Sequence, residues 1–235
     1  ELKWTAHSKA TQYIVYKRVI GVDTALTPYI ETGSTGYIDT AVEAGKTYTY
    51  SIQVCTNNGD SAYNTSGYTI TRVPCTEVTT LFTEKNGVRV NWKTVSGVDG
   101  YSIHRRPLSS NAWTKVGTVK NDVSSFIDTG LSSGTQYVYA VTPIINNSEG
   151  AKIESSVIYF IKAPDNVNAT NEIDGIKVTW NRVGGAVSYA IFRKDIFGNT
   201  EQIGSVEGNT NVTFTDKNVQ NGETYMASVP SEELL

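Results

Sequence analysis

Residues 90–104 read VNWKTVSGVDGYSIH, and two variants of this text occur elsewhere, LKWTAHSKATQYIVY at residues 2–16 and VTWNRVGGAVSYAIF at residues 178–192. The tryptophans recur every 88 residues, and a tyrosine follows each tryptophan nine residues later. The members are Trp4, Trp92 and Trp180, with Tyr13, Tyr101 and Tyr189. A fixed period of this length indicates one folding unit copied in tandem.

The second copy shows the strand pattern of one unit. Val88, Val90 and Trp92 alternate with polar residues, which is typical of a strand with one buried face. Asn86-Gly87, just before them, is a strong tight-turn signal. The expected strands are 78–82, 88–92, 101–105, 113–119, 125–127, 137–141 and 155–161, with a hairpin loop at 146–150. Seven short alternating strands predict an all-β protein made of antiparallel β-sandwiches, each anchored by a buried tryptophan.

A third recurring element precedes the sixth strand of each copy. It reads Val42-x-x-Gly45-x-x-Tyr48, Leu131-x-x-Gly134-x-x-Tyr137 and Val219-x-x-Gly222-x-x-Tyr225. With the tryptophans and tyrosines already quoted, it makes the chain resemble the fibronectin type III family over nearly its whole length. The resemblance implies immunoglobulin-like sandwiches in which this tyrosine hydroxyl bonds to backbone upstream. The paired cysteines of antibody-type domains are absent, and the wording is most similar to bacterial surface and secreted versions.

The repeat divides the chain into residues 1–74, 75–163 and 164–235. The joins Arg72-Val73-Pro74 and Lys162-Ala163-Pro164 are short and restricted by proline, so we expect an extended, semi-rigid string of modules. The first repeat lacks its first strand (strand A) and the third lacks its last (strand G). These open edges are either fragment boundaries or acceptors for strands from neighbouring copies.

Charge and hydropathy exclude two classes of partner. The net charge is −3 and the pI about 5.5, and the basic residues are scattered, with Arg105-Arg106 the densest arginine pair. Nucleic-acid binding needs a concentrated basic face, so we expect none. No apolar run reaches the length of a membrane span, so we expect no membrane insertion within this segment.

No catalytic, cofactor-binding or metal-binding residues are predicted. His7 and His104 lie in different repeats, without a surrounding triad or metal-ligand spacing. Asp39, Asp128 and Asp216 recur in register, and we expect them to cap backbone amides at a turn. Cys55 and Cys75 fall at opposite poles of the first repeat, so we expect one buried and one exposed thiol rather than a disulfide.

Several features tempt a binding hypothesis. Asn58-Gly59-Asp60 occupies the loop where integrin-binding family members carry Arg-Gly-Asp, but asparagine replaces the cation and a plain hairpin turn is favoured. Trp113 has no aromatic counterpart in the third repeat and either binds a sugar or partner or covers a sheet edge. Glycan acceptor triplets begin at Asn64, Asn146, Asn168 and Asn211.

These observations favour a non-catalytic spacer of a larger extracellular or cell-surface protein, which presents other domains or mediates adhesion. A carbohydrate-contacting adhesin module and a phage virion or tail decoration protein are the alternatives. Catalysis would belong to a neighbouring domain. We expect a monomer with no cofactor, and a protein or glycan partner that the sequence does not identify.

Overall fold

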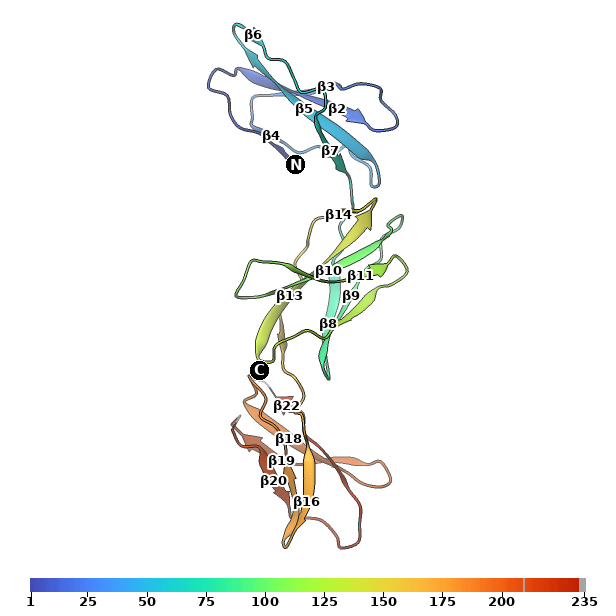
Figure 1. Ribbon diagram of the computed structural model, residues 1–235, viewed down its shortest axis with the longest axis vertical. Coiled ribbons are helices and arrows are strands. Elements are labelled where there is room, and N and C mark those ends of the chain that lie inside the picture. Colours follow the sequence, from blue (N-terminus) through green and yellow to red (C-terminus); the bar gives the residue numbers. More distant parts are fainter. Residues whose placement is uncertain (209, 233–235) are drawn as a thin grey trace.

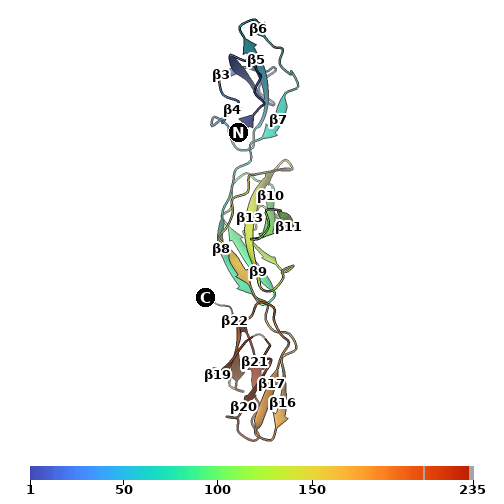
Figure 2. The ribbon, with the colours of Figure 1, turned by 90° about the vertical axis from the view of Figure 1, so that its left-hand side faces the viewer.

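The structure is a computed structural model that describes residues 1–208 and 210–232. Its regular secondary structure in these residues is β-strand throughout, and every strand pairing is antiparallel. The strands form three groups that follow one another along the longest axis of the molecule, as the two views in Figures 1 and 2 show. The all-β fold with three antiparallel sandwiches in tandem is confirmed.

The middle repeat is the complete one. One of its sheets has the order β12-β9-β8, and the other has β11-β10-β13, with β14 and β15 also pairing with β13. The bounds are β8 (Val78–Glu84), β9 (Gly87–Trp92), β10 (Gly100–Pro107), β11 (Thr114–Lys120), β12 (Ser125–Asp128), β13 (Thr135–Ile145), β14 (Ser148–Glu149) and β15 (Ile158–Phe160). The hairpin after β13 is tighter than expected, because Asn146 and Asn147 both have positive φ and close a two-residue turn.

The first and third repeats have the same layers, and the described residues contain no strand A in the first repeat and no strand G in the third, as the sequence predicted. The first repeat comprises β1 (Leu2–Lys3), β2 (Gln12–Val19), β3 (Thr27–Thr32), β4 (Gly36–Tyr37), β5 (Thr47–Thr56), β6 (Gly59–Asp60) and β7 (Tyr68–Thr71). The third comprises β16 (Asn168–Glu172), β17 (Gly175–Thr179), β18 (Ser188–Lys194), β19 (Thr200–Glu207), β20 (Thr213–Asp216), β21 (Met226–Ser228) and β22 (Ser231–Glu232). In the first repeat β1 pairs with β4 and has no described strand on its other edge. Residues 209 and 233–235 of the third repeat lie outside the described part of the chain.

The repeated aromatic residues form a ring pair in each repeat. The ring centroids of Trp92 and Tyr101 lie 5.5 Å apart, and those of Trp180 and Tyr189 lie 5.3 Å apart. Both tryptophans are 3% exposed, as expected of core anchors. Trp4 keeps the same contact with its tyrosine but is only half-buried. The prediction of a buried Trp4 is therefore wrong in degree, because the edge of β1 opposite β4 carries no strand among the described residues that would cover the indole.

Gly87 of the predicted Asn86-Gly87 turn lies just after the turn and not within it. The turn consists of Lys85 and Asn86, and Gly87 already belongs to β9. A Cβ at Gly87 would lie 2.3 Å from the carbonyl oxygen of Asp128 on the neighbouring strand. Glycine is therefore needed there because β12 approaches so closely, and Gly175 meets Asp216 in the same way.

Each join places an aliphatic side chain in the core of the following repeat. Val73 follows β7 of the first repeat, but it is 5% exposed and belongs to the core cluster of the second. Ile161, 88 residues later, follows β15 and packs against the core cluster of the third repeat. The joins are thus anchored by burial of apolar surface as well as restricted by proline.

The second join is also closed by direct contacts between repeats. The hydroxyl of Ser133 donates to the carbonyl oxygen of Gly184 at 2.7 Å, and the hydroxyl of Tyr159 donates to that of Gly185 at 3.4 Å. A Cβ on Gly185 would lie 2.3 Å from the Cα of Gly134, so the two backbones touch. Gly97 occupies the equivalent position in the second repeat, and a Cβ there would meet nothing within 4 Å. The two joins therefore differ in how closely the neighbouring loops pack.

Candidate functional site

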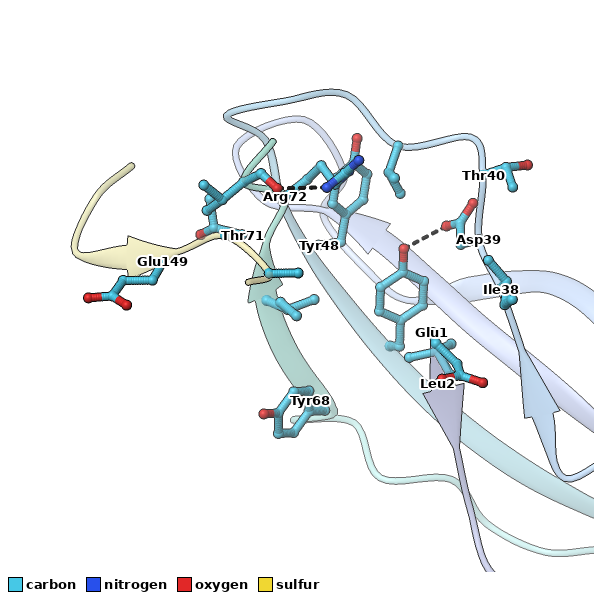
Figure 3. Close-up of a pocket in the computed structure, with 16 residues that line it drawn as sticks. Glu1, Leu2, Ile38, Asp39, Thr40, Tyr48, Tyr68, Thr71, Arg72 and Glu149 are labelled. Carbon is cyan, nitrogen blue, oxygen red and sulfur yellow. Dashed lines mark hydrogen bonds between the residues drawn. The ribbon is translucent and has the colours of Figure 1, made fainter. Parts of the chain in front are cut away.

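A groove of about 600 Å³ lies at the end of the first repeat that faces the second. It lies between β1, the segment after β4, and β7, and the tip of β14 from the second repeat reaches its rim (Figure 3). Tyr48, Tyr68, Leu2 and Ile38 are among its lining residues, and Glu149 lies on the β14 side. The groove is therefore lined mainly by apolar and aromatic side chains of one repeat.

The floor of the groove is a face of the sandwich that would normally be interior. Residues directly opposite each other in an antiparallel pair point to the same side of the sheet. Ile70 pairs with Tyr48, which is buried, so Ile70 also faces inward. It is nevertheless 51% exposed, whereas Ile158, its equivalent in the second repeat, packs against the core. Tyr68, two residues before Ile70, is 71% exposed for the same reason.

A buried carboxylate closes one end of the groove. Asp39 Oδ2 accepts hydrogen bonds from Tyr50 Oη and lies 2.6 Å from Lys17 Nζ, and its Oδ1 accepts one from Tyr29 Oη at 3.0 Å. Burial acts to raise the pKa of Asp39, but the hydrogen bonds from Lys17, Tyr50 and Tyr29 outweigh it and hold the pKa below its ordinary value. Burial, followed by the hydrogen bond to the Asp39 carboxylate, raises the pKa of Tyr50. Both carboxylate oxygens of Asp39 therefore already have partners, namely Lys17, Tyr50 and Tyr29.

This ionic cluster recurs at the same place in each repeat. Arg105 binds both carboxylate oxygens of Asp128, at 2.9 and 2.7 Å, and Tyr139 Oη donates to Oδ2 at 2.9 Å. In the third repeat Arg193 binds Asp216 at 2.9 Å. The basic residue on the third strand is therefore the partner that sequence reasoning missed. Its signal was visible, since Lys17, Arg105 and Arg193 follow the 88-residue period.

The predicted capping by these aspartates is also present. Asp39 accepts a hydrogen bond from the amide of Ala41 at 3.0 Å, and Asp128 and Asp216 accept from the amides of Gly130 and Asn218. The aspartates thus fix a turn and join the two sheets through one side chain. Their role in all three repeats is structural.

The corner tyrosines accept the backbone hydrogen bonds that the family resemblance implied. Tyr48 and Tyr137 accept from the amides of Glu43 and Ser132 at 2.8 and 2.9 Å. Tyr225 accepts from the amide of Gln220 at 3.4 Å. In each case the donor lies five residues upstream.

The structure surrounds His104 with polar groups that the sequence did not bring together. His104 Nε2 lies 3.0 Å from Glu149 Oε2 and 3.2 Å from Thr142 Oγ1. Glu149 Oε1 accepts from Ser102 Oγ at 2.7 Å and from Lys115 Nζ at 2.9 Å. A carboxylate only accepts, so Nε2 carries the hydrogen in the neutral ring. The register of β10 on β13 and the short hairpin place Glu149 beside His104, a contact that the sequence analysis did not predict.

This cluster does not have the geometry of a nucleophile and base. Ser102 donates to the carboxylate and not to the histidine, so nothing in the contact deprotonates its hydroxyl. Burial, followed by the charge of Lys152, lowers the pKa of His104, while Glu149 has its pKa lowered to about 2 by Lys115 and Ser102 against the opposing effect of burial. The arrangement is an ion and hydrogen-bond network on the outer face of the sheet. His7 is remote from it, in the loop before β2, where its amide donates to Tyr13 Oη.

The other candidate residues fall in separate places. Trp113 is half-buried, and the guanidinium of Arg106 lies over its ring, 5.3 Å from the centroid. Asn58 belongs to the two-residue turn between β5 and β6, as a plain hairpin requires. Cys55 is buried and Cys75 exposed, both as free thiols, as predicted. Asn64, Asn146, Asn168 and Asn211 are exposed. Within residues 1–208 and 210–232 no group of three or more acidic, histidine or cysteine side chains is placed to hold a metal ion, and no helix is long and apolar enough to cross a bilayer.

The strand order of the middle repeat decides the family resemblance. A three-stranded sheet of its first, second and fifth strands (β8, β9 and β12) faces a sheet of its fourth, third, sixth and last strands (β11, β10, β13 and β15). The chain is a tandem array of antiparallel sandwiches with the strand order that the resemblance to the fibronectin type III family implied.

No protein-family model matches the array. It is similar to Tenascin-R of Rattus norvegicus, at 24% identity over 84% of the chain and 15% of that protein, and to Exoglucanase B of Cellulomonas fimi, at 22% identity over 97% of the chain and 22% of the enzyme. A match of 28% identity to the Amylopullulanase of Thermoanaerobacter thermohydrosulfuricus covers 42% of the chain and 6% of that protein. The array thus spans less than a quarter of the length of these curated relatives.

Solved structures with a similar fold include the FN1–FN3 domains of chicken CNTN1, at 16% identity and a TM-score of 0.32 over 97% of the chain and 85% of that structure. A segment of two fibronectin type III domains from chicken tenascin has 15% identity and a TM-score of 0.38 over 68% of the chain and 100% of that structure.

Proposed function

We propose that the chain is a non-catalytic spacer of a larger extracellular or cell-surface protein, in which it holds other domains apart or presents them for adhesion. The observation that carries this proposal is the pair of anchored joins, in which Val73 is buried in the next core and Ile161, partly buried, packs against the next core. Anchors of this kind restrict the motion of one repeat relative to the next. A spacer that keeps flanking domains at a fixed distance needs this restriction, whereas a flexible linker does not.

The proposed modules are residues 1–74, 75–163 and 164–235, with Val73 and Ile161 completing the core that follows each boundary. The three ring pairs and the three aspartate clusters support this division, because each repeat contains one of each. A module of about this size buries enough apolar surface to fold without a metal or disulfide.

The share of the curated relatives that the chain matches supports a non-catalytic role. Two of them are named Exoglucanase B and Amylopullulanase, and the chain matches only 22% and 6% of their lengths. The matched segment is small, and its recurring ionic clusters hold the sandwiches together. These properties fit an accessory region beside a catalytic domain. Tenascin-R supports the same reading for a protein that is not named as an enzyme.

Small-angle X-ray scattering tests the proposal on the whole chain. Three sandwiches about 35 Å long, each set by a strand the length of β13, give a rod with a radius of gyration of about 30 Å when placed end to end. A compact globule of 235 residues has about 18 Å. A value near 30 Å that does not change with salt concentration supports the spacer, and a value near 18 Å contradicts it.

A further inference from the structure

We propose that the first join is a hinge whose pivot lies between Arg72 and Val73, while the second join is rigid. Rotation at this pivot changes the direction in which the first repeat points relative to the other two, and it leaves every sandwich intact. The inference goes beyond the spacer role and does not depend on it, because it rests on the contacts of the two joins.

The residue before the pivot is fixed to the first repeat. The amide of Arg72 donates to the carbonyl oxygen of Lys46 at 2.8 Å, and the amide of Gly45 donates to the carbonyl oxygen of Arg72 at the same distance. These two bonds follow directly on the pairing of β7 with β5. The backbone of Arg72 therefore moves with the first sandwich.

The residues after the pivot are fixed to the second repeat. Val73 is buried in the second core, and a Cβ at Gly150, just after β14, would lie 2.4 Å from the carbonyl oxygen of Pro74. Motion between the two repeats therefore passes through two backbone rotations, ψ of Arg72 and φ of Val73, and a few such rotations are enough for a hinge. Arg72 Nη1 donates to the carbonyl oxygen of Val73 at 2.6 Å, but this bond joins adjacent residues and water can replace it.

The second join is held by a hydroxyl that bridges three segments. Ser133 Oγ accepts from the amide of Lys162 at 3.1 Å and donates to the carbonyl oxygen of Gly184 at 2.7 Å. The corner loop of the second repeat, the join and a loop of the third repeat are thus connected through one side chain. Tyr159 Oη adds its bond to the carbonyl oxygen of Gly185. Rotation at this join would break these contacts together.

The sequence of the first join removes both halves of this bridge. The recurring corner element places Ala44 where the second repeat has Ser133, and alanine has no hydroxyl. The 88-residue period places Pro74 where the second join has Lys162, and proline has no amide hydrogen. A Cβ at Gly97, in the facing loop of the second repeat, would meet nothing within 4 Å. Among residues 1–208 and 210–232, no hydrogen bond connects that loop with the corner of the first repeat.

Double electron–electron resonance between nitroxide labels compares the two joins with matched pairs of sites. Glu31, Thr118 and Ser205 are exposed and occupy equivalent register positions on β3, β11 and β19. In a chain with Cys55→Ala and Cys75→Ser, labels on Glu31→Cys and Thr118→Cys measure the first join, and labels on Thr118→Cys and Ser205→Cys measure the second. We expect the distance distribution across the first join to be about twofold wider than that across the second.

Two serine variants test the bridge itself. Ser133→Ala removes the bridging hydroxyl and should widen the distribution across the second join. Ser132→Ala makes the same change at an exposed neighbour whose hydroxyl has no partner among the described residues, and it should leave the width unchanged. In the opposite direction, Ala44→Ser combined with Pro74→Lys restores both halves of the bridge and should narrow the distribution across the first join. Circular dichroism verifies that each variant is folded.

Equal widths across the two joins would overturn the proposal, and so would a second join that Ser133→Ala does not widen. These outcomes are distinct from failure of the spacer role. A compact radius of gyration would contradict the spacer whatever the widths are, whereas equal widths in an extended chain would contradict only the hinge.

Discussion

At the scale of single residues, the chain uses side-chain oxygens to hold its loops at fixed places in each repeat. Besides the corner tyrosines, the tyrosine nine residues after each tryptophan accepts an amide hydrogen from the loop six residues earlier. For Tyr101 the donor is the amide of Val95 at 2.7 Å. The tyrosines that recur with the tryptophans therefore have two structural roles: their rings pack against the indoles, and their hydroxyls hold a loop. Only the first was predicted for these tyrosines.

Replacing Asp128 by asparagine should destabilise the second repeat by about 3 kcal/mol. The change keeps the shape and the amide contact to Gly130 but leaves the partly buried Arg105 without its countercharge. Chemical denaturation followed by fluorescence measures the loss. Asp122→Asn, at an exposed site, should change the free energy of unfolding by less than about 0.5 kcal/mol. Equal effects of the two substitutions would contradict a structural role for the aspartate cluster.

The His104 network should make the stability of the chain depend on pH. Burial lowers the folded-state pKa of His104 below 6.5, so the unfolded chain binds the proton more readily. Its contribution is fully present above about pH 6.5 and is lost as the pH falls below that value. Glu149, with its pKa lowered from 4.5 to about 2, adds a second loss as the pH falls from about 4.5 towards 2.

Denaturation midpoints between pH 7.5 and 5.5 measure the histidine effect. His104→Gln should reduce the dependence in this range, and His7→Gln, in an exposed loop, should retain it. If the pH dependence of the denaturation midpoint is unchanged in His104→Gln, a group other than His104 causes it.

At the scale of elements, the strands were predictable and their ends were not. Alternation along residues 88–92 and 101–105 identified β9 and β10, although only β9 has a single buried face and β10 is also covered at Ser102 and His104. The last strand was expected over 155–161, but regular pairing covers only Ile158–Phe160. The His104 network and the contact between Gly134 and Gly185 depend on which loops meet in space. No period or local pattern in the sequence records such meetings.

Gly185→Ala should open the join between the second and third repeats. The new Cβ would collide with Gly134, and Gly185 has a φ of 86° that alanine adopts with strain. Gly97→Ala separates the two effects, because Gly97 has a φ of 75° but an empty surrounding. We expect both variants to lose about 1 kcal/mol in unfolding free energy from backbone strain. Only Gly185→Ala should broaden the distance between spin labels placed on the second and third repeats. Equal distance distributions would contradict a closed join.

Val73→Ala should destabilise the second repeat although Val73 follows the last strand of the first. Removing two buried methyl groups and leaving a small cavity should lower the free energy of unfolding by about 2 kcal/mol. Hydrogen exchange assigns the loss, because the amides of the second core should exchange faster and those of the first should not. Val22→Ala, at a well-exposed valine, is the control. Faster exchange confined to the first repeat would contradict the assignment of Val73 to the core of the second repeat.

At the scale of the whole molecule, the sequence predicted the tandem arrangement because the period fixes the number and order of the repeats. The half-exposed Trp4 follows from the same reasoning, since a missing first strand leaves its neighbour uncovered. What the period could not show is that the two joins are unequal. Both have a proline and an aliphatic anchor, yet the described contacts close the second join against Gly134 and leave a groove beside the first.

The anchors at Val73 and Ile161 give the rod a direction under mechanical load. Tension that strips β7 or β15 from its own sheet also pulls on the residue seated in the sandwich that follows. The residue-level contacts at these two positions therefore transmit a disturbance towards the C-terminus more directly than towards the N-terminus. Loss of β7 or β15 from its own sheet should therefore weaken the sandwich that follows, whichever end of the chain is pulled.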